Sequence, residues 1–542
     1  MSLIGALARM EAVAAGRAQP AATVRHRHLA ERPMVLVPLT TAGEAGAPLG
    51  ALVGTDRDAP RLLVVPQPRD RDLRFAFLAA LAEIVLPHLE SAQDEVEHGE
   101  RGGEETELCA DAPQLIVPNG PGVDFVRLLG RSTRFRRTAE QDPETPHPAP
   151  AHVPLLGRWL THYGERARVP GSALLVAMTE LLTRHWATGQ SHLEDQHLGA
   201  LLAWIEAAED GRDDGAAAAL QAETARDAKG LLLTPPAGPA TDPAFDNHRL
   251  APAVQRFDAG LTGAEQEIHD LIESQLLPTW RSVWHGVDLL RALPEGASVA
   301  DRWRRDRFSY THHRDRVRAG EPPQPKRDDA VTAANKLASR EQAQARLDAQ
   351  EALDDPLVMA ARRLAGEAFA GVVVGVEEAW SEGKRPRPRP LVTVRTDDRP
   401  HLAERGTVHR RLGDGATKQS AELAGVPGEG LLTLRLTNGM GRGKEPAPGS
   451  VPEPGDRLVW TLFEHSPRGG PGLPEPEDTP WTHGGPPGGF AAPAALVDAA
   501  EAAEAAEAAT RGESAPEAGA ETALRVLRPA DPPDPETAED FL

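Results

Sequence analysis

One stretch of the sequence is dense in side chains that can bind anions. Residues 302–318, RWRRDRFSYTHHRDRVR, contain seven arginines, two histidines and three aromatic residues. Arginine forms forked contacts with phosphate or carboxylate, and arginine interleaved with aromatic rings can also hold unpaired bases by stacking. From 302 to 327, nine Lys and Arg stand against three acidic residues, a local charge of +6. A second basic segment, RLLGRSTRFRRT at 127–138, has five arginines and Phe135.

Helical geometry limits how the first segment can act. With about 100° of rotation per residue, Trp303, Tyr310 and Val317 fall on one narrow apolar stripe of a helix over 299–319. The arginines surround this stripe and do not gather on one face, which does not suit a helix that binds in a DNA groove. We therefore expect the stripe to pack in a core, with arginine stems beside it.

The remaining basic side chains predict a surface that contacts nucleic acid or a protein partner. The outward Arg304, Arg305 and Arg316 have two possible kinds of partner, phosphates or the protein's own carboxylates. The residues that we expect to make such contacts are Arg131, Arg134, Arg136, Arg137, Arg304, Arg305, Arg316, Lys326 and Arg327.

The sequence contains no complete catalytic signature that we can identify. The serine-hydrolase pattern G-x-S-x-G and the zinc-protease pattern H-E-x-x-H do not occur. NGMGRGKE at 438–445 departs from a phosphate-binding loop at both ends, and NGPGVDF at 119–125 lacks the third glycine of a dinucleotide loop. His312 and His313 point about 100° apart on a helix and cannot share a metal ion. We expect no catalytic residue, no metal and no cofactor.

The alternative hypothesis is that the protein is an enzyme. Asp56 and Asp58, in GTDRDAP, lie between two predicted strands, and Asp124 follows at the start of a predicted helix. Two carboxylates at a strand end can bind a divalent cation, so the alternative is a metal-dependent hydrolase or nuclease with its site in this domain. A hairpin turn also favours Asp and Gly, and we prefer that interpretation.

Composition restricts the class of protein. The 542 residues carry a net charge of −22, which argues against a basic nucleic-acid coat but allows a local basic patch. The single cysteine, Cys109, cannot form an internal disulfide, which favours the cytoplasm. Residues 2–14 predict an amphipathic helix and not a signal peptide, and no apolar run is long enough to span a membrane.

The order of elements predicts a multidomain α+β protein that begins with a small α/β domain at 1–137. Its expected strands are 34–39, 48–54, 61–68 and 114–118, and its expected helices are 72–92 and 122–130. We expect a polar loop at 93–107 and a proline-rich linker at 138–152.

A helical bundle is expected over 153–320, helical throughout, followed by connecting helices at 321–367. Three Ser or Thr residues stand three positions before Glu or Asp, the spacing of a capping box. We expect Pro278 to kink or split the helix that contains it. The three pairs are Ser191 with Glu194, Thr262 with Glu265, and Ser298 with Asp301.

The last part of the sequence changes to alternating strands. Five short strands over 368–466 predict a small antiparallel barrel of the OB or SH3-like kind. The residues that follow, 467–542, are rich in Pro and Gly and then acidic, which predicts a disordered tail.

The function that these features favour is a non-catalytic accessory or scaffold protein of nucleic-acid metabolism. It would bind nucleic acid, or a larger protein partner such as a helicase or a nuclease, or both of these. The barrel, the two arginine-rich segments and the acidic tail are the basis of this expectation, and the link from barrel to nucleic acid is an analogy at the level of fold. A further hypothesis is a purely protein-binding adaptor, whose helical domain docks on a larger motor or nuclease.

Overall fold

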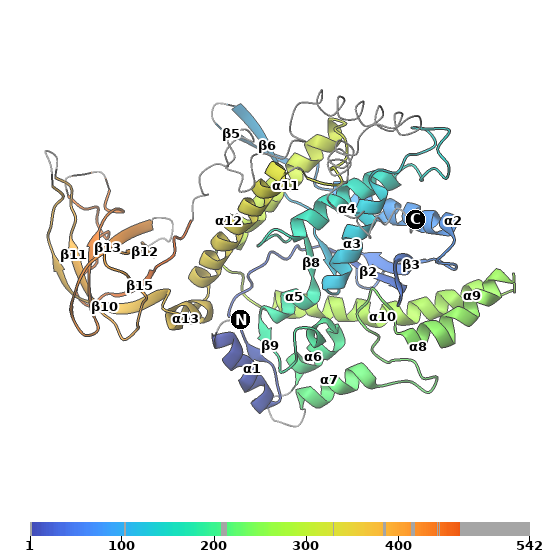
Figure 1. Cartoon of the computed structure of the whole chain (residues 1–542), viewed down its shortest axis with the longest axis horizontal. Coiled ribbons are helices and arrows are strands. Elements are labelled where there is room, and N and C mark those ends of the chain that lie inside the picture. The colour runs from blue at the N-terminus through green and yellow to red at the C-terminus, as the bar shows by residue number, and fades with distance from the viewer. Residues whose placement is uncertain are drawn as a thin grey trace, which may run out of the picture. The chain divides into compact units, whose positions relative to one another are not determined.

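The structure is a computed structural model that describes residues 3–101, 104–207, 214–328, 330–382, 386–412, 418–441, 443 and 445–466. Its elements are shown in Figure 1. The predicted tail at 467–542 lies outside the described residues. Within the described residues, no helix has both the length and the apolar character needed to cross a membrane.

A five-stranded mixed sheet forms the centre of the N-terminal part. Its order is β4-β3-β2-β7-β8, in which β2, β7 and β8 run parallel and β3 and β4 are antiparallel neighbours. Successive residues of β2 and β3 are buried, so both faces of the sheet are covered. The strands are β2 (Met34–Thr41), β3 (Glu44–Gly54), β4 (Arg61–Val64), β7 (Leu115–Val117) and β8 (Leu175–Ala177).

The predicted strands of this domain are confirmed as β2, β3, β4 and β7, and two other predictions are wrong. Strand β8 lies in the stretch expected to be helical throughout, because a short apolar run such as LLVA does not distinguish strand from helix. The expected polar loop at 93–107 contains the hairpin of β5 (Val96–Arg101) and β6 (Glu104–Cys109). Its sequence is charged and lacks the apolar alternation that marks a strand.

Helices cover the sheet and share its core. Helix α4 contacts both α2 and α3, and all three contact the sheet, while α10 lies across β2, β3 and β4 together with α5 and α6. Gly50 of β3 allows β4 and α10 to approach closely, because a Cβ atom there would lie 2.3 Å from the carbonyl oxygen of Leu63 and 3.1 Å from a methyl of Ile272. One continuous hydrophobic core extends in sequence from Met34 to Tyr310. The sheet and the helices of 153–320 therefore bury their side chains together.

The helices named so far and those that complete the chain have these bounds: α1 (Leu3–Ala15), α2 (Arg71–Glu90), α3 (Gly120–Thr133), α4 (Val153–Ala167), α5 (Met178–Thr183), α6 (Leu198–Glu206), α7 (Gly215–Thr224), α8 (Pro243–Phe245), α9 (Ala251–Asp258), α10 (Ala264–Arg291), α11 (Val299–Arg318), α12 (Ala330–Asp354) and α13 (Pro356–Leu364). Two single turns, η1 (Glu194–Gln196) and η2 (Asp246–Leu250), and a short pair of strands, β1 (Gln19–Pro20) and β9 (Trp186–Ala187), lie between them.

The predicted helix starts are confirmed in part. Ser191 and Glu194 exchange the two hydrogen bonds of a capping box, but they open the short turn η1 and not a long helix. Helix α10 begins after Gly263 without a side-chain cap, and it continues through Pro278. Helix α11 begins after Ser298 as predicted, although the hydroxyl of Ser298 donates to Asp354 and not to its own helix.

The C-terminal barrel is closed and has six antiparallel strands in the order β10-β11-β14-β13-β12-β15. The prediction of five strands omitted β13, whose sequence KQSAELAGVPG is poor in the β-branched and aromatic residues that mark a strand. A six-stranded closed barrel also differs from the five-stranded, partly open OB fold. The strands are β10 (Ala368–Glu377), β11 (Leu391–Arg395), β12 (Thr407–Arg411), β13 (Lys418–Gly428), β14 (Leu431–Leu436) and β15 (Arg457–Thr461).

Helix α11 is held in the core by a buried carboxylate. Asp306 is 0% exposed, and its side chain accepts hydrogen bonds from Nη2 of Arg166 at 2.7 Å and from the hydroxyl of Ser172 at 2.8 Å. The backbone N–H of Ala173 donates to its other oxygen at 2.7 Å. These bonds join α11 to α4 and to the chain that leads into β8. Every hydrogen-bonding contact offsets part of the cost of burying the charge.

Two buried histidines also join α4 to α11. The rings of His162 and His313 are stacked with centroids 4.2 Å apart, and the rings of Trp159 and His313 meet in a T-shaped arrangement. The Nε2 atoms of both rings are buried and have no hydrogen-bond partner among the described residues. Burial lowers the pKa of His313 to about 3, and the charges of Arg158 and Arg316 act in the same direction. Burial likewise lowers the pKa of His162 well below its usual value.

Replacing Asp306 by Ala should lower the free energy of unfolding by about 3–5 kcal/mol, because Arg166 would keep its charge and lose its buried partner. Glu321→Ala is the control, since Glu321 is an exposed carboxylate just after the same helix and its partner Arg316 is itself partly exposed. It should change stability by about 1 kcal/mol or less. Denaturant unfolding measures both, and equal losses of stability in the two variants would contradict the assignment.

The stacked histidines should make the fold less stable in mild acid. Both are neutral in the folded chain, whereas an unfolded histidine takes up a proton below about pH 6.5. Their contribution is therefore complete above pH 6.5 and is lost as pH falls toward the low folded pKa. The free energy of unfolding should fall by about 2 kcal/mol for His313 between pH 6.5 and pH 5.

His313→Phe keeps a ring in the stack and removes its proton site, so the variant should lose less stability over the same pH interval than the parent protein. His152→Gln changes an exposed histidine just before α4 and should leave the pH dependence as it was. Denaturant midpoints at the two pH values decide between the outcomes. A His313→Phe variant with the parent's full pH dependence would overturn the argument.

Candidate binding surface

Two arginines of α11 are buried and form hydrogen bonds within the protein. Arg302 is buried, and its guanidinium donates to Oε1 of Gln350 at 3.1 Å and to the carbonyl of His26 at 2.9 Å. Arg314 is also buried, and it donates to the carbonyl of Gln93 at 2.8 Å. These two side chains fasten α11 to neighbouring segments.

The outward arginines of α11 meet carboxylates of the protein itself in two of the three cases. Arg305 pairs with Asp301, one turn earlier, and Arg316 pairs with Glu321. Arg304 is exposed, and its guanidinium lies 5.7 Å from the ring centroid of Phe308. The segment that is richest in arginine in the sequence is therefore largely occupied with internal contacts.

The second basic segment meets the end of the first one around an aromatic ring. Phe135, just after α3, is 39% exposed. The guanidinium of Arg134 lies 4.6 Å from its ring centroid, and Nζ of Lys326 lies 5.8 Å from it. Arg134 is buried and donates to the carbonyls of Gln324 and Pro325, at 3.0 and 3.4 Å. These bonds bring residues that are about 190 positions apart in sequence to one place.

Two further cations belong to segments that contact the chain around Gln324. The side chain of Gln324 donates to the carbonyl of Arg158 on α4 at 3.1 Å, and Arg158 lies close enough to Arg316 to feel its charge. We use the name Phe135 surface for the following set of residues: Arg131, Arg134, Phe135, Arg136, Arg137, Arg158, Arg316 and Lys326.

Neighbouring cations of this surface affect one another's pKa, and acidic residues act in the opposite direction. Burial, and then the charge of Arg316, lower the pKa of Arg158. Burial, and then the charge of Arg71, lower the pKa of Arg74 on α2, and Arg136 acts in the same direction. Like charges that depress one another's pKa are stabilised by an anion. The ion pairs of the surface include Arg137 with Asp142 as well as Arg316 with Glu321.

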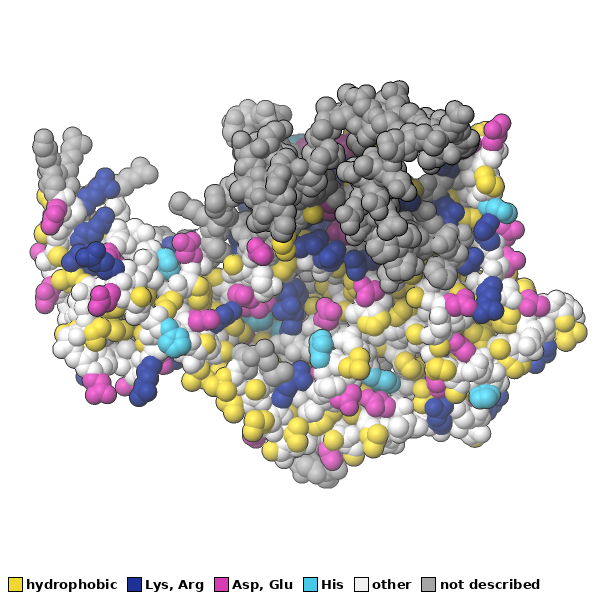
Figure 2. Space-filling view, in the orientation of Figure 1, with side chains coloured by type: hydrophobic (Ala, Val, Ile, Leu, Met, Phe, Trp, Pro, Cys, Tyr) yellow, Lys and Arg dark blue, Asp and Glu magenta, His cyan; other side chains and the backbone are white. Residues whose placement is uncertain are grey.

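The predicted contact residues thus divide into groups. Arg131, Arg134, Arg136, Arg137, Arg316 and Lys326 belong to the Phe135 surface, and Arg304 and Arg305 lie elsewhere on α11. Arg327 is exposed. Sequence reasoning missed Arg158, a single arginine in an amphipathic helix, because nothing in its local pattern indicates that α11 ends beside it. On the coloured part of the face shown in Figure 2, cationic and acidic side chains are interspersed, so the surface has to be defined by individual contacts.

The place where α/β proteins commonly bind ligands is occupied by the protein's own side chains. Ligands of such sheets usually lie beyond the carboxyl ends of parallel strands, where helix N-termini attract phosphate. Here Oε1 of Gln196 accepts from the N–H of Gly120 at 3.0 Å, and Oδ1 of Asn119 accepts from the N–H of Gly122 at 3.1 Å. Asn119 in turn donates to the carbonyl of Gly238. The N–H groups of Gly120 and Gly122 at the start of α3 are therefore satisfied internally.

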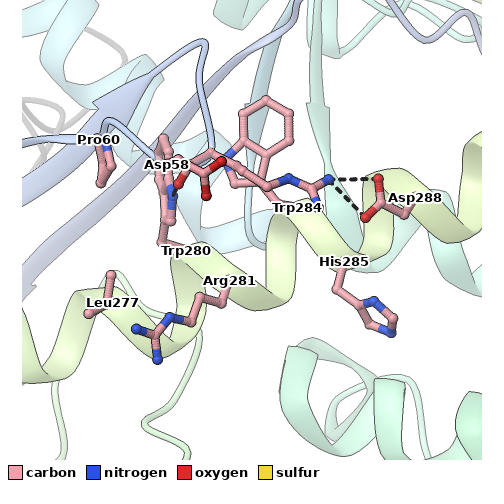
Figure 3. A pocket seen from close by; sticks show the side chains of 9 residues that line it. Asp58, Pro60, Leu277, Trp280, Arg281, Trp284, His285 and Asp288 are labelled. Atoms are coloured by element: carbon pink, nitrogen blue, oxygen red, sulfur yellow. Dashed lines mark hydrogen bonds and ion pairs between the residues drawn. The ribbon is translucent and has the colours of Figure 1, made fainter.

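The aspartates of the alternative hypothesis form a turn. The carboxylate of Asp56 accepts from the N–H of Asp58 at 3.0 Å, as expected for a hairpin connection. Asp58 lines a pocket of about 390 Å³ with Trp280 and Trp284 of α10. Figure 3 shows this pocket, and its dashed lines mark the two hydrogen bonds from Arg57 to Asp288, at 2.7 and 2.8 Å.

Asp124 does not join this pair. Strand β3 leaves the sheet at the edge where β2 begins, while Asp124 follows the opposite, carboxyl end of β7. The side chain of Asp124 receives a hydrogen bond from Arg127 at 2.9 Å. Among the described residues, the one group with the spacing of metal ligands is His269, Asp270 and Glu273, on α10, and it contains none of these aspartates.

The geometry therefore offers a cationic and partly aromatic surface, which can hold an anionic polymer by charge and by stacking. Helix α3, helix α4 and the chain after α11 position it. Comparisons of the chain with protein-family models, with curated proteins and with solved structures find no match.

Proposed function

We propose that the protein is a non-catalytic accessory protein that binds nucleic acid through the Phe135 surface. The observation that supports this most directly is the convergence of two basic segments, distant in sequence, on one exposed aromatic ring. Arginine and lysine beside a ring can hold the phosphates of a strand while the ring stacks on a base. A larger helicase or nuclease is the partner that such an accessory protein would assist.

Single-stranded nucleic acid suits this surface better than duplex. A ring such as Phe135 can stack only on a base that is not already stacked within a duplex. Helix α11 presents no single basic face for a major groove, because Arg302 and Arg314 are buried and Arg305 and Arg316 are paired.

The alternative, a metal-dependent hydrolase or nuclease, has less support. It needs two or three carboxylates around one ion. Asp56 is engaged in its turn, and Asp124 lies beyond the other edge of the sheet.

The proposed location is the cytoplasm, where the single thiol would remain reduced. Cys109 is buried, and its sulfur receives a hydrogen bond from Arg314 at 3.3 Å.

Phe135→Ala should weaken binding of a single-stranded oligonucleotide by roughly 5-fold to 150-fold, the reduction expected for one stacked base. Duplex binding should change less, because duplex bases are not available to the ring. Fluorescence anisotropy with labelled single-stranded and duplex probes measures both. The protein should show falling affinity as salt rises, since phosphate contacts release counterions.

The matched charge variants are Arg136→Gln with Lys326→Gln, against Arg281→Gln as the control. Arg281 is an exposed arginine on α10, outside the Phe135 surface. The double variant should reduce the slope of the logarithm of affinity against the logarithm of salt concentration by about one for each phosphate that the protein no longer neutralises. The control should keep the parent's slope. Absence of binding by the parent protein at low salt would reject the proposed function.

A further inference from the structure

A small pocket on another part of the molecule combines cations with an apolar wall. Its volume is about 200 Å³. It lies between the loop after α7, the chain of α8 and η2, and the side chain of Gln275 on α10. The cationic and titratable residues that line it are Arg226, Lys229, His248 and Arg249, with Asp242 as the one carboxylate, and its apolar wall contains Leu231, Leu232 and Phe245.

Hydrogen bonds within the loop fix the conformation of one side of the pocket. The carboxylate of Asp227 accepts from the N–H groups of Lys229 and Leu231, at 2.8 and 2.9 Å. The backbone N–H of Asp227 donates to the carbonyl of Leu231. Arg226 closes the loop by donating to the carbonyl of Gly230 at 2.9 Å, and its other nitrogen lies 3.4 Å from Asp242. Lys229 is therefore presented from a tight turn.

Within the described residues, the other cations of the pocket have no direct partner. The side chains of Lys229, His248 and Arg249 make no ion pair or hydrogen bond with a described residue, although Asp227 is near enough to interact with Lys229 and Arg249 through its charge. The Nε atom of Arg249 is buried without a hydrogen-bond partner in the described part of the chain. A half-buried guanidinium beside apolar side chains gains most from a directly bound anion.

We propose that this pocket binds a small phosphate monoester. Lys229 and Arg249 line it without a direct partner among the described residues, and their two positive charges match a phosphate with two negative charges better than a carboxylate with one. Arg226, in its pair with Asp242, and His248 lie beside them. The volume leaves room for about six or seven water-sized groups, so the organic part is small. The wall of Leu231, Leu232 and Phe245 favours an apolar organic part over inorganic phosphate alone.

This inference is independent of the proposed function. None of the lining residues belongs to the Phe135 surface, and the ligand is a small molecule and not a strand. A pocket that binds phosphate monoesters would stand even if nucleic acid did not bind, and the reverse also holds.

The test is calorimetric titration of the full-length protein with phenyl phosphate, inorganic phosphate and benzoate at low ionic strength. Phenyl phosphate should bind, and inorganic phosphate and benzoate should each bind more weakly, because one lacks the apolar part and the other the second charge. Arg249→Gln and Lys229→Gln should each weaken phenyl phosphate binding by about tenfold or more, the effect of removing a charge-assisted hydrogen bond. Arg281→Gln, an exposed arginine of another pocket, should bind as the parent does.

Lys229 is exposed, so Lys229→Gln keeps the test valid if Arg249→Gln does not fold. Circular dichroism and the melting temperature establish folding for each variant. No heat of binding with phenyl phosphate for the parent protein, or equal affinity in the parent and folded Lys229→Gln, would overturn the proposal. Benzoate binding as tightly as phenyl phosphate would also overturn it, since the site would not require a dianion.

Discussion

The buried carboxylate of Asp306 is the constraint on which the arrangement of the N-terminal part depends. A charge with no exposure to solvent is costly unless every oxygen is hydrogen-bonded, and here three donors from two other segments supply the bonds. The donors come from α4 and from the chain before β8, so the last strand of the sheet and α11 are placed by the same group. Tyr310 of the same helix is also buried and donates to the carbonyl of Leu89, beside the end of α2.

Two adjacent aspartates perform a similar role at the junction of α12 and α13. Asp354 accepts from the backbone and hydroxyl of Ser298, at 2.8 and 2.9 Å, and so holds the start of α11. Asp355 accepts from the N–H of Thr23 at 2.7 Å and also caps α13 through Leu357. Polar side chains in the core thus specify which segments meet. Arg302 and Arg314 take part in the same kind of contact, through Gln350 and the carbonyls of His26 and Gln93, and are therefore unavailable to an external partner.

The local sequence pattern correctly predicted the elements whose formation depends mainly on their own residues. The strands β2, β3, β4 and β7 and the bounds of α11 follow from apolar runs and periodicity, and Asp355 followed by Pro356 marks the start of α13. The elements that were missed depend on neighbours. Strand β8 is three residues long and exists because β7 lies beside it, and β13 is completed by pairing with β12 and β14. Short strands gain their hydrogen bonds from partners that a local sequence pattern does not show.

The sequence alone determined the types and the density of the charged residues, the apolar stripe of 299–319 and the absence of complete catalytic signatures. Tertiary structure decided which arginines are buried, which pair with the protein's own carboxylates and which surround Phe135. It also decided that Lys229 and Arg249 line one pocket. The physical reason is that the energy of a charge depends on its partners and its exposure to water, and both are set by segments far away in the chain.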